Sequence, residues 1–192
     1  MSFYTGTQDE VLYAFGGAST NLATFTTEDN LLKTYPPCLI PGSIFANVGG
    51  RSSSMKIRAC GQVGSTATPT YTFTLRLISG NPAWSAGGLV LGASNAVTAG
   101  STVTLAPWQL DVDIVLRTLA AGGSATTSVV TMGTITGLGF PTAGSIPASN
   151  VTPVLATIDV SATYSLFLSC ACSASNSLNL INTQMFKVYG EN

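Results

Sequence analysis

Residues 71–77 read Tyr-Thr-Phe-Thr-Leu-Arg-Leu, an unbroken alternation of apolar and polar side chains. Successive side chains of a β-strand point to opposite faces, so this period of two predicts a strand with one face on a core. Tyr71, Phe73, Leu75 and Leu77 are expected to point inward. No stretch of the sequence has a convincing helical period, and the chain is therefore predicted to be all-β.

A longer strand is predicted over residues 108–118, WQLDVDIVLRT. Its inward face is expected to carry Trp108, Leu110, Val112, Ile114 and Leu116, and its outward face Gln109, Asp111, Asp113, Val115 and Arg117. Six residues of these two strands are predicted to form the centre of the core: Phe73, Leu75, Trp108, Leu110, Val112 and Ile114.

Six further strands are predicted near residues 55–63, 89–91, 128–132, 155–160, 164–172 and 178–189. Clusters of Gly, Pro, Asn and Ser separate them, as β-turns require. About eight short strands with turns between them favour an antiparallel β-sandwich. We predict the jelly-roll type, with a Greek-key sandwich of the immunoglobulin type as the alternative.

The first 34 residues differ from the rest, because they contain no base before Lys33 and are rich in aromatic side chains. Such a segment cannot bury its rings alone. It is either an arm that reaches a neighbouring subunit or an extra edge strand on its own sandwich. We accordingly divide the chain into residues 1–34, an N-terminal arm or edge segment, and residues 35–192, the sandwich domain. The aromatic residues of the N-terminal segment are Phe3, Tyr4, Tyr13, Phe15 and Phe25, of which the first four are candidate assembly contacts.

Residues 138–153 contain three prolines and few strand formers, which predicts a long loop. Phe140 and Ile146 are candidate assembly contacts in this loop, and Val151 could dock a partner in the same way. The alternative is a loop that closes over one end of its own sandwich.

The chain contains no histidine and only 7 basic and 8 acidic residues. Few other side chains exchange protons near neutral pH, so most catalytic constellations are excluded and no enzyme is expected. Asp111 and Asp113 share a strand face about 7 Å apart, the kind of pair a glycosidase uses. With Arg117 in line, however, an exposed charged stripe is the favoured interpretation.

Charged residues make up 8% of the chain and the net charge is −1. Weak repulsion between copies and a neutral polar surface suit a protein packed in an assembly. A secreted adhesin or a carbohydrate-binding module is the alternative, with Trp84, Tyr35 and Tyr164 as candidate stacking residues. For Trp84 we favour a structural role, as a plug at the edge of the sandwich.

Nucleic acid is not an expected partner, because the few bases are spread along the sequence. No membrane crossing is expected, since the apolar stretches fall short of the roughly 20 residues that a spanning helix needs. The first residues resemble no secretory signal, so export by that route is not expected.

No cofactor or metal is expected. Calcium binding is not excluded by the sequence, because loops with Asp and Asn can supply oxygen ligands. Cys170 and Cys172 share a strand face and are predicted to be small buried hydrophobes. For the cysteines as a set we favour free buried thiols over a disulfide between Cys38 and Cys60, and that disulfide over a metal site.

Several segments, in this order and spacing, resemble jelly-roll virion proteins of tailed bacteriophages, of the head decoration, capsid fibre or minor tail type. From residue 32 onward the resemblance rests on a proline-rich entry, a strand opened by Gly-Arg, a Thr-Pro-Thr hairpin, a strand led by tryptophan and an Asn-bearing turn. These are LKTYPPCLIPGSIF (32–45), GRSSSMKIRACG (50–61), STATPTYTFTLRL (65–77), WQLDVDIVLRT (108–118, followed by Gly122-Gly123) and SASNSLNL (173–180).

The resemblance implies a non-enzymatic structural protein on the outer surface of a phage head or tail, made in the cytoplasm of the host bacterium. We expect a head decoration (cement) protein that stabilises the capsid. Its expected partners are two further copies of itself, in a homotrimer, and the major capsid protein or another virion protein. The alternative is a tail or fibre module that binds a host receptor or glycan.

Overall fold

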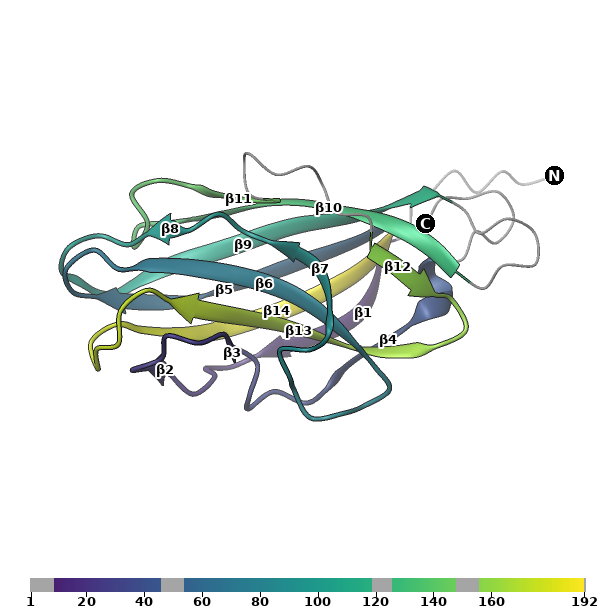
Figure 1. The fold of residues 1–192 in the computed structure, drawn as a ribbon, viewed down its shortest axis with the longest axis horizontal. Coiled ribbons are helices and arrows are strands. Elements are labelled where there is room, and N and C mark those ends of the chain that lie inside the picture. Colours follow the sequence, from purple (N-terminus) through teal and green to yellow (C-terminus); the bar gives the residue numbers. More distant parts are fainter. Residues whose placement is uncertain (1–8, 46–53, 119–125, 148–155, 192) are drawn as a thin grey trace.

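The computed structural model describes residues 9–45, 54–118, 126–147 and 156–191, which form two antiparallel sheets packed face to face (Figure 1). The first sheet has the order β1 (Asp9–Gly16), β14 (Leu180–Glu191), β5 (Ser54–Ser65), β9 (Val103–Thr118), β10 (Thr126–Gly137) and β11 (Gly144–Ile146), with β2 (Leu22–Ala23) beside β14 and β12 (Ala156–Asp159) beside β10. The second has the order β3 (Asp29–Asn30), β13 (Thr163–Cys172), β6 (Thr70–Ser79) and β7 (Leu89–Ala93), with β4 (Cys38–Pro41) beside β13 and β8 (Val97–Thr98) beside β6. A short 3-10 helix, η1 (Gly42–Phe45), follows β4.

The strands are connected as in a jelly roll. The first strand, β1, pairs with the last, β14; β4 pairs with β13, β5 with β9, and β6 with β7. The chain therefore folds like one long hairpin wrapped around the core, and β10, β11 and β12 are an addition before β13. Immunoglobulin sandwiches distribute their strands differently between the sheets, so that alternative is wrong.

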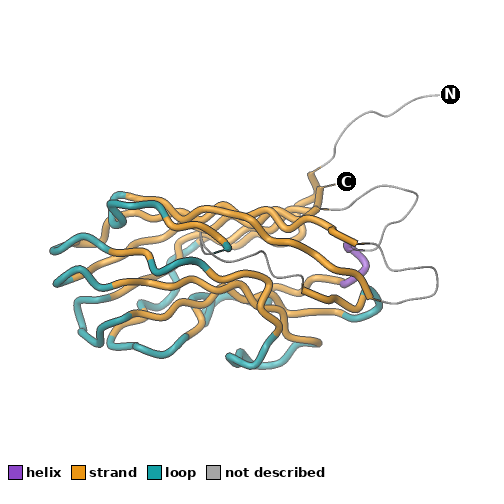
Figure 2. Tube along the Cα trace, turned by 45° about the horizontal axis from the view of Figure 1, so that its top comes forward, coloured by secondary structure: helices purple, strands orange, loops and turns teal. Residues whose placement is uncertain are grey.

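The two sheets lie face to face (Figure 2), and the core lies between them. The alternation of each strand decides which side chains enter it. All six predicted core residues are buried. The rings of Phe73 from β6 and Trp108 from β9 lie 5.2 Å apart and join the two sheets. Trp108 also donates its indole N–H to the carbonyl oxygen of Asn182 on β14, 3.1 Å away. The side chain of Leu116 lies outside the described residues.

Residues 9–34 belong to the sandwich and do not form a projecting arm. Strand β1 pairs along β14 as an edge strand, and its Leu12, Tyr13 and Phe15 pack against the core. Tyr13 packs against Phe186 with ring centroids 6.0 Å apart, and Phe15 packs against Tyr35 at 4.4 Å. Tyr13 and Phe15 thus contact their own sandwich. Phe25 is buried, whereas Phe3 and Tyr4 lie outside the described residues.

The predicted loop at 138–153 is partly a strand, since β11 pairs with β10. Phe140 and Ile146 are buried, and the ring of Phe140 meets Tyr71 at 5.9 Å. Neither side chain is available on the surface as an assembly contact. The segment closes over its own core because burying these apolar side chains removes their surface from water, which is favourable. Val151 lies outside the described residues.

All four cysteines are free thiols. Cys38 points into the core from β4, while Cys60 occupies an outward position on β5, so a sheet separates the two sulfurs. Burial raises the pKa of Cys38 to about 12, which keeps this thiol protonated and unreactive. Cys170 and Cys172 are both buried on the inner face of β13.

Candidate functional site

Asp111 and Asp113 lie on the outer face of β9, half exposed, as members of a charged ladder. Directly opposite them on β5 are Arg58 and Lys56. Lys56 Nζ lies 3.7 Å from a carboxylate oxygen of each aspartate, and Arg58 Nε lies 3.3 Å from Asp111 Oδ2. Each carboxylate is therefore neutralised at the surface, where such pairs contribute little to stability. The side chain of Arg117 lies outside the described residues.

A second ion pair is better protected and ties the N-terminal segment to the outer face of the second sheet. Arg76 Nε and Nη2 each donate to Glu28 at 2.6 Å, and the hydroxyl of Ser169 donates to the same carboxylate. Burial alone would raise the pKa of Glu28, but the hydrogen bonds from Arg76 and Ser169 and the charge of Arg76 outweigh it and lower that pKa. All these polar groups are engaged with one another, which indicates a structural role.

Exposed leucines lie at one end of the sandwich, in the turn after β10, in the turn before β14 and near the start of β9. We call this region, residues 64–68, 102–105, 137–139 and 175–180, the leucine end. In Figure 1 these turns lie at the end away from the C-terminus. Leu105, Leu138 and Leu178 are 44%, 84% and 60% exposed. Exposed apolar side chains that gather in one region are typical of interaction sites.

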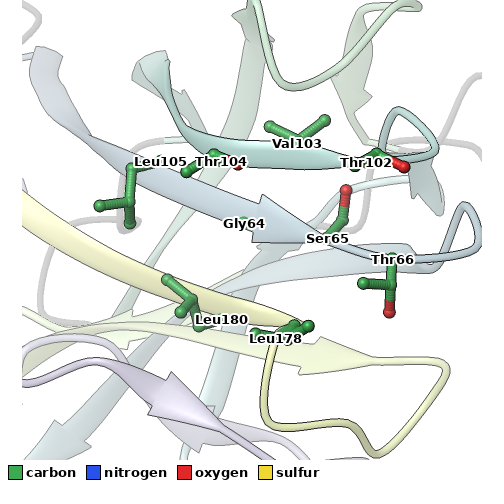
Figure 3. A pocket seen from close by; sticks show the side chains of 9 residues that line it. All are labelled: Gly64, Ser65, Thr66, Thr102, Val103, Thr104, Leu105, Leu178 and Leu180. Carbon is green, nitrogen blue, oxygen red and sulfur yellow. The ribbon is translucent and has the colours of Figure 1, made fainter.

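A hollow of about 150 Å³ lies in the leucine end (Figure 3). Leu105 and Leu180 stand on either side of Gly64, whose missing side chain leaves the floor open. A Cβ atom on Gly64 would lie 3.2 Å from both the carbonyl oxygen of Leu178 and Cγ of Leu180. The hollow is lined by Gly64, Ser65, Thr66, Thr102, Val103, Thr104, Leu105, Leu178 and Leu180.

The backbone of the leucine end is strained. Non-glycine residues rarely adopt a positive φ, yet Ala67 and Thr68 have φ 55°, Leu105 has φ 48° and Thr102 has φ 138°. Each such conformation costs on the order of 1–3 kcal/mol and persists only where its surroundings impose it. Side-chain hydrogen bonds supply part of that constraint, because Asn179 Oδ1 accepts the backbone N–H of Thr66 at 2.8 Å. Strain of this kind is characteristic of binding surfaces.

A groove of about 290 Å³ crosses the outer face of the second sheet, between residues 30–38 and 82–84. We call it the Trp84 groove. Trp84 is half-buried, and its indole N–H is buried without a hydrogen-bond partner among the residues that the structure describes. Phe167 enters from an outward position of β13. The lining consists of Asn30, Leu32, Lys33, Tyr35, Pro36, Pro37, Cys38, Pro82, Ala83, Trp84, Leu166 and Phe167.

Of the three predicted stacking residues, the structure brings Trp84 and Tyr35 together in this groove. The Tyr35 side chain is buried, and its hydroxyl donates toward the carbonyl oxygens of Gly17 and Thr183, so only part of the ring is offered to a ligand. Tyr164 lies elsewhere. It is buried, and its hydroxyl oxygen accepts the backbone N–H of Asp159 at 2.9 Å.

Several site residues were missed by the sequence reasoning. Phe167 could have been found from the alternation of its strand, because it is an aromatic residue in the same alternating set as Ser165 and Ser169. Leu138 and Leu178 could have been found as large apolar residues set among Gly, Asn and Ser in turns. No sequence signal places Leu105 and Leu178 at one hollow, because that arrangement depends on the pairing of β5 with β9 and β14.

In the parts of the chain that the structure describes, no cluster of His, Cys, Asp and Glu could hold a metal ion. No helix among the described residues is long and apolar enough to span a bilayer.

Comparisons with known proteins yield little. No protein-family model matches the chain, and no curated protein matches it in sequence. A similar solved structure is the CBM2 module of the evolved Dit of Lactobacillus casei BL23 phage J-1, which is 12% identical over 97% of each chain with a TM-score of 0.38. A likeness at this level establishes neither a shared fold nor a shared function.

Proposed function

We propose that this chain is a non-enzymatic structural protein of a tailed-phage virion, which binds the outer surface of the head as a homo-oligomer and stabilises it. The observation that carries the proposal is the leucine end. Leu138 and Leu178 are exposed in turns, and Leu105, near the start of β9, is exposed and has a φ of 48°. Burying these leucines against a partner would stabilise the complex by about 25 cal/mol for each Å² of apolar surface removed from water.

Two further features support this assignment. The jelly-roll connectivity agrees with the fold implied by the sequence resemblance. The net charge of −1 permits close packing of copies, because few charges need to be desolvated between them. An oligomer, for which we propose a trimer, binds several capsid subunits at once and gains avidity from the high effective concentration of linked contacts.

The proposal is tested by light scattering of the purified protein and co-sedimentation with undecorated phage heads. Wild-type protein should be oligomeric and should pellet with heads. A variant with Leu105, Leu138 and Leu178 replaced by Ser should remain folded and stay in the supernatant. Leu39→Ser is the matched control, since Leu39 on β4 is 44% exposed, as is Leu105, but lies away from the leucine end. Equal pelleting of the triple variant would overturn the assignment of this surface, and failure of the wild type to pellet would overturn head decoration.

A second function, a tail or fibre module that binds a receptor or glycan on the host surface, is favoured by the Trp84 groove. Ligand sites in proteins are concave and carry a few polar groups among apolar ones, and this groove has both. Binding of the purified protein to host cells, with no binding to heads, would select this function.

A further inference from the structure

We infer that the Trp84 groove binds an uncharged oligosaccharide, with a sugar ring stacked on the indole of Trp84. This inference rests on the second candidate function and names its ligand class. A pyranose ring has an apolar C–H face and a rim of hydroxyl groups. A complementary site therefore needs a flat apolar surface with hydrogen-bonding groups around it and no unpaired charge.

The apolar surface is supplied by two segments that are distant in the sequence and by strand β13. Pro36 and Pro37 lie on one wall, Pro82 and Trp84 lie on the other, and Phe167 is between them on β13. Proline fixes its own backbone torsion, and the strand holds Phe167, so of these groups only the Trp84 side chain needs to be ordered when a ligand binds. At about 290 Å³ the groove lies near the lower limit of small-molecule sites, which begin at roughly 300 Å³. A short stretch of one or two sugar units matches this size.

The loop that carries Trp84 is fixed at its ends and adjustable between them. Gly80 N–H donates to Thr163 O at 2.7 Å, Ser165 Oγ donates to Gly80 O at 2.8 Å, and Arg76 Nη1 donates to Gly88 O at 2.9 Å. No hydrogen bond from residues 81–87 is seen within the described part of the chain, and Trp84 is the only one of these residues that is not fully exposed.

The position of Trp84 therefore depends on packing, and a small rotation of its ring changes what the indole N–H can reach. That N–H is buried and has no acceptor in the described part of the chain. Leaving a buried donor unpaired is unfavourable, so an acceptor brought by a ligand is stabilising. A sugar hydroxyl or ring oxygen is such an acceptor. The stack and this hydrogen bond would thus be formed together.

The charges beside the groove neutralise one another. Lys33 Nζ lies 2.6 Å from Asp29 Oδ2, and Arg76 is paired with Glu28. A strongly charged ligand would have to compete with these pairs. Asn30 and Lys33 are the polar residues that line the groove, although Asn30 Oδ1 already accepts the backbone N–H of Leu32 at 2.9 Å. An uncharged, hydroxyl-rich ligand fits this electrostatic environment.

A peptide that adds a strand to the sheet does not fit. The groove lies over β13, which pairs with β6 on one side and with β3 and β4 on the other. Its backbone groups are already used in the sheet, so no open edge is available for main-chain pairing. A proline-rich peptide in an extended left-handed helix would need only an aromatic groove, and the experiment includes it as a competitor.

The test titrates the purified full chain with a panel of uncharged oligosaccharides built from hexoses, deoxyhexoses and N-acetylhexosamines, by calorimetry and by NMR. At least one sugar should bind, and Trp84→Ala should weaken it about tenfold or more, the loss of roughly one stacking contact with its hydrogen bond. The matched control is Tyr189→Ala, which removes a half-buried ring from the outer face of the other sheet. Ala83→Arg, at an exposed position of the groove, blocks the site and leaves the indole in place.

The outcomes separate the ligand class from the second candidate function. Sugar binding that falls with Trp84→Ala and Ala83→Arg, and not with Tyr189→Ala, supports the inference. Sugar binding unaffected by both groove variants overturns it. Host-cell binding that is lost in the groove variants, but is competed by a proline-rich peptide and by no sugar, overturns the ligand class and leaves the receptor function standing. Absence of both sugar binding and cell binding overturns the two together.

Discussion

Replacing Trp108 with Ala should be among the most damaging single substitutions in this protein. The side chain is buried at the centre of the core and its ring lies 5.2 Å from that of Phe73 on the opposite sheet. Truncating a buried Trp removes its apolar burial and leaves a cavity, at a cost of about 3–5 kcal/mol. The carbonyl oxygen of Asn182 also loses its indole donor, so the cost should fall in the upper half of that range.

The assay is urea unfolding followed by far-ultraviolet circular dichroism, with thermal unfolding alongside. For a chain of this length about 3–5 kcal/mol corresponds to a fall in melting temperature of roughly 6–20 °C. Trp108→Phe is the matched control. It keeps an aromatic ring against Phe73 and loses only the hydrogen bond and some volume, so it should cost about 1–2 kcal/mol. A loss below about 1.5 kcal/mol for Trp108→Ala, with an unchanged denaturant slope, would refute the central position of this ring.

The remaining predictions concern the surface charges and the close approach of two strands. Glu28→Gln should lower the urea midpoint at pH 7 by an amount equivalent to about 1–3 kcal/mol, because it leaves Arg76 partly buried without its carboxylate. The pKa of Glu28 is lowered on folding, so its contribution is present above the ordinary glutamate value of about 4.3 and disappears as the pH falls through the lowered value. Urea midpoints of wild type and variant should therefore converge on acidification below pH 4, and a constant difference would contradict this reasoning. Lys56→Ala should lower the free energy of unfolding by less than about 1 kcal/mol in 0.15 M salt, since both of its ion pairs are partly exposed and 3.7 Å long. A larger fall in melting temperature would show that the charged ladder contributes to stability. Gly61→Ala should cost about 1–3 kcal/mol in chemical unfolding, because the added Cβ would lie 1.9 Å from the carbonyl oxygen of Asn182 and the backbone would have to move; an unchanged midpoint would mean that β5 and β14 can separate without penalty.

The strands and their inward faces could be predicted from the amino-acid sequence, because the period of two is a local property of the chain. Phe73 and Trp108 point into the core where the alternation places them. Cys170 and Cys172 share the inner face of β13 for the same reason. Most predicted strand ends are nearly right, but β9 begins at Val103, before the predicted Trp108, and β10 continues to Gly137, beyond the predicted Met132. The charged stripe at Asp111 and Asp113 follows equally from local alternation.

The partners of each segment depend on contacts between residues far apart in the chain, and local periodicity does not contain them. Whether residues 9–34 would project or pack was decided by the pairing of β1 with β14 at the opposite end of the sequence. Phe140 and Ile146 sit in a segment with turn residues, yet both are buried, because the folded sheets leave an open core end that apolar side chains fill. The same holds for both candidate sites. Leu105 and Leu178 line one hollow because β9 and β14 both flank β5 in the first sheet, and Trp84 and Phe167 line one groove because β13 pairs with β6 in the second, and neither pairing is written in the local sequence.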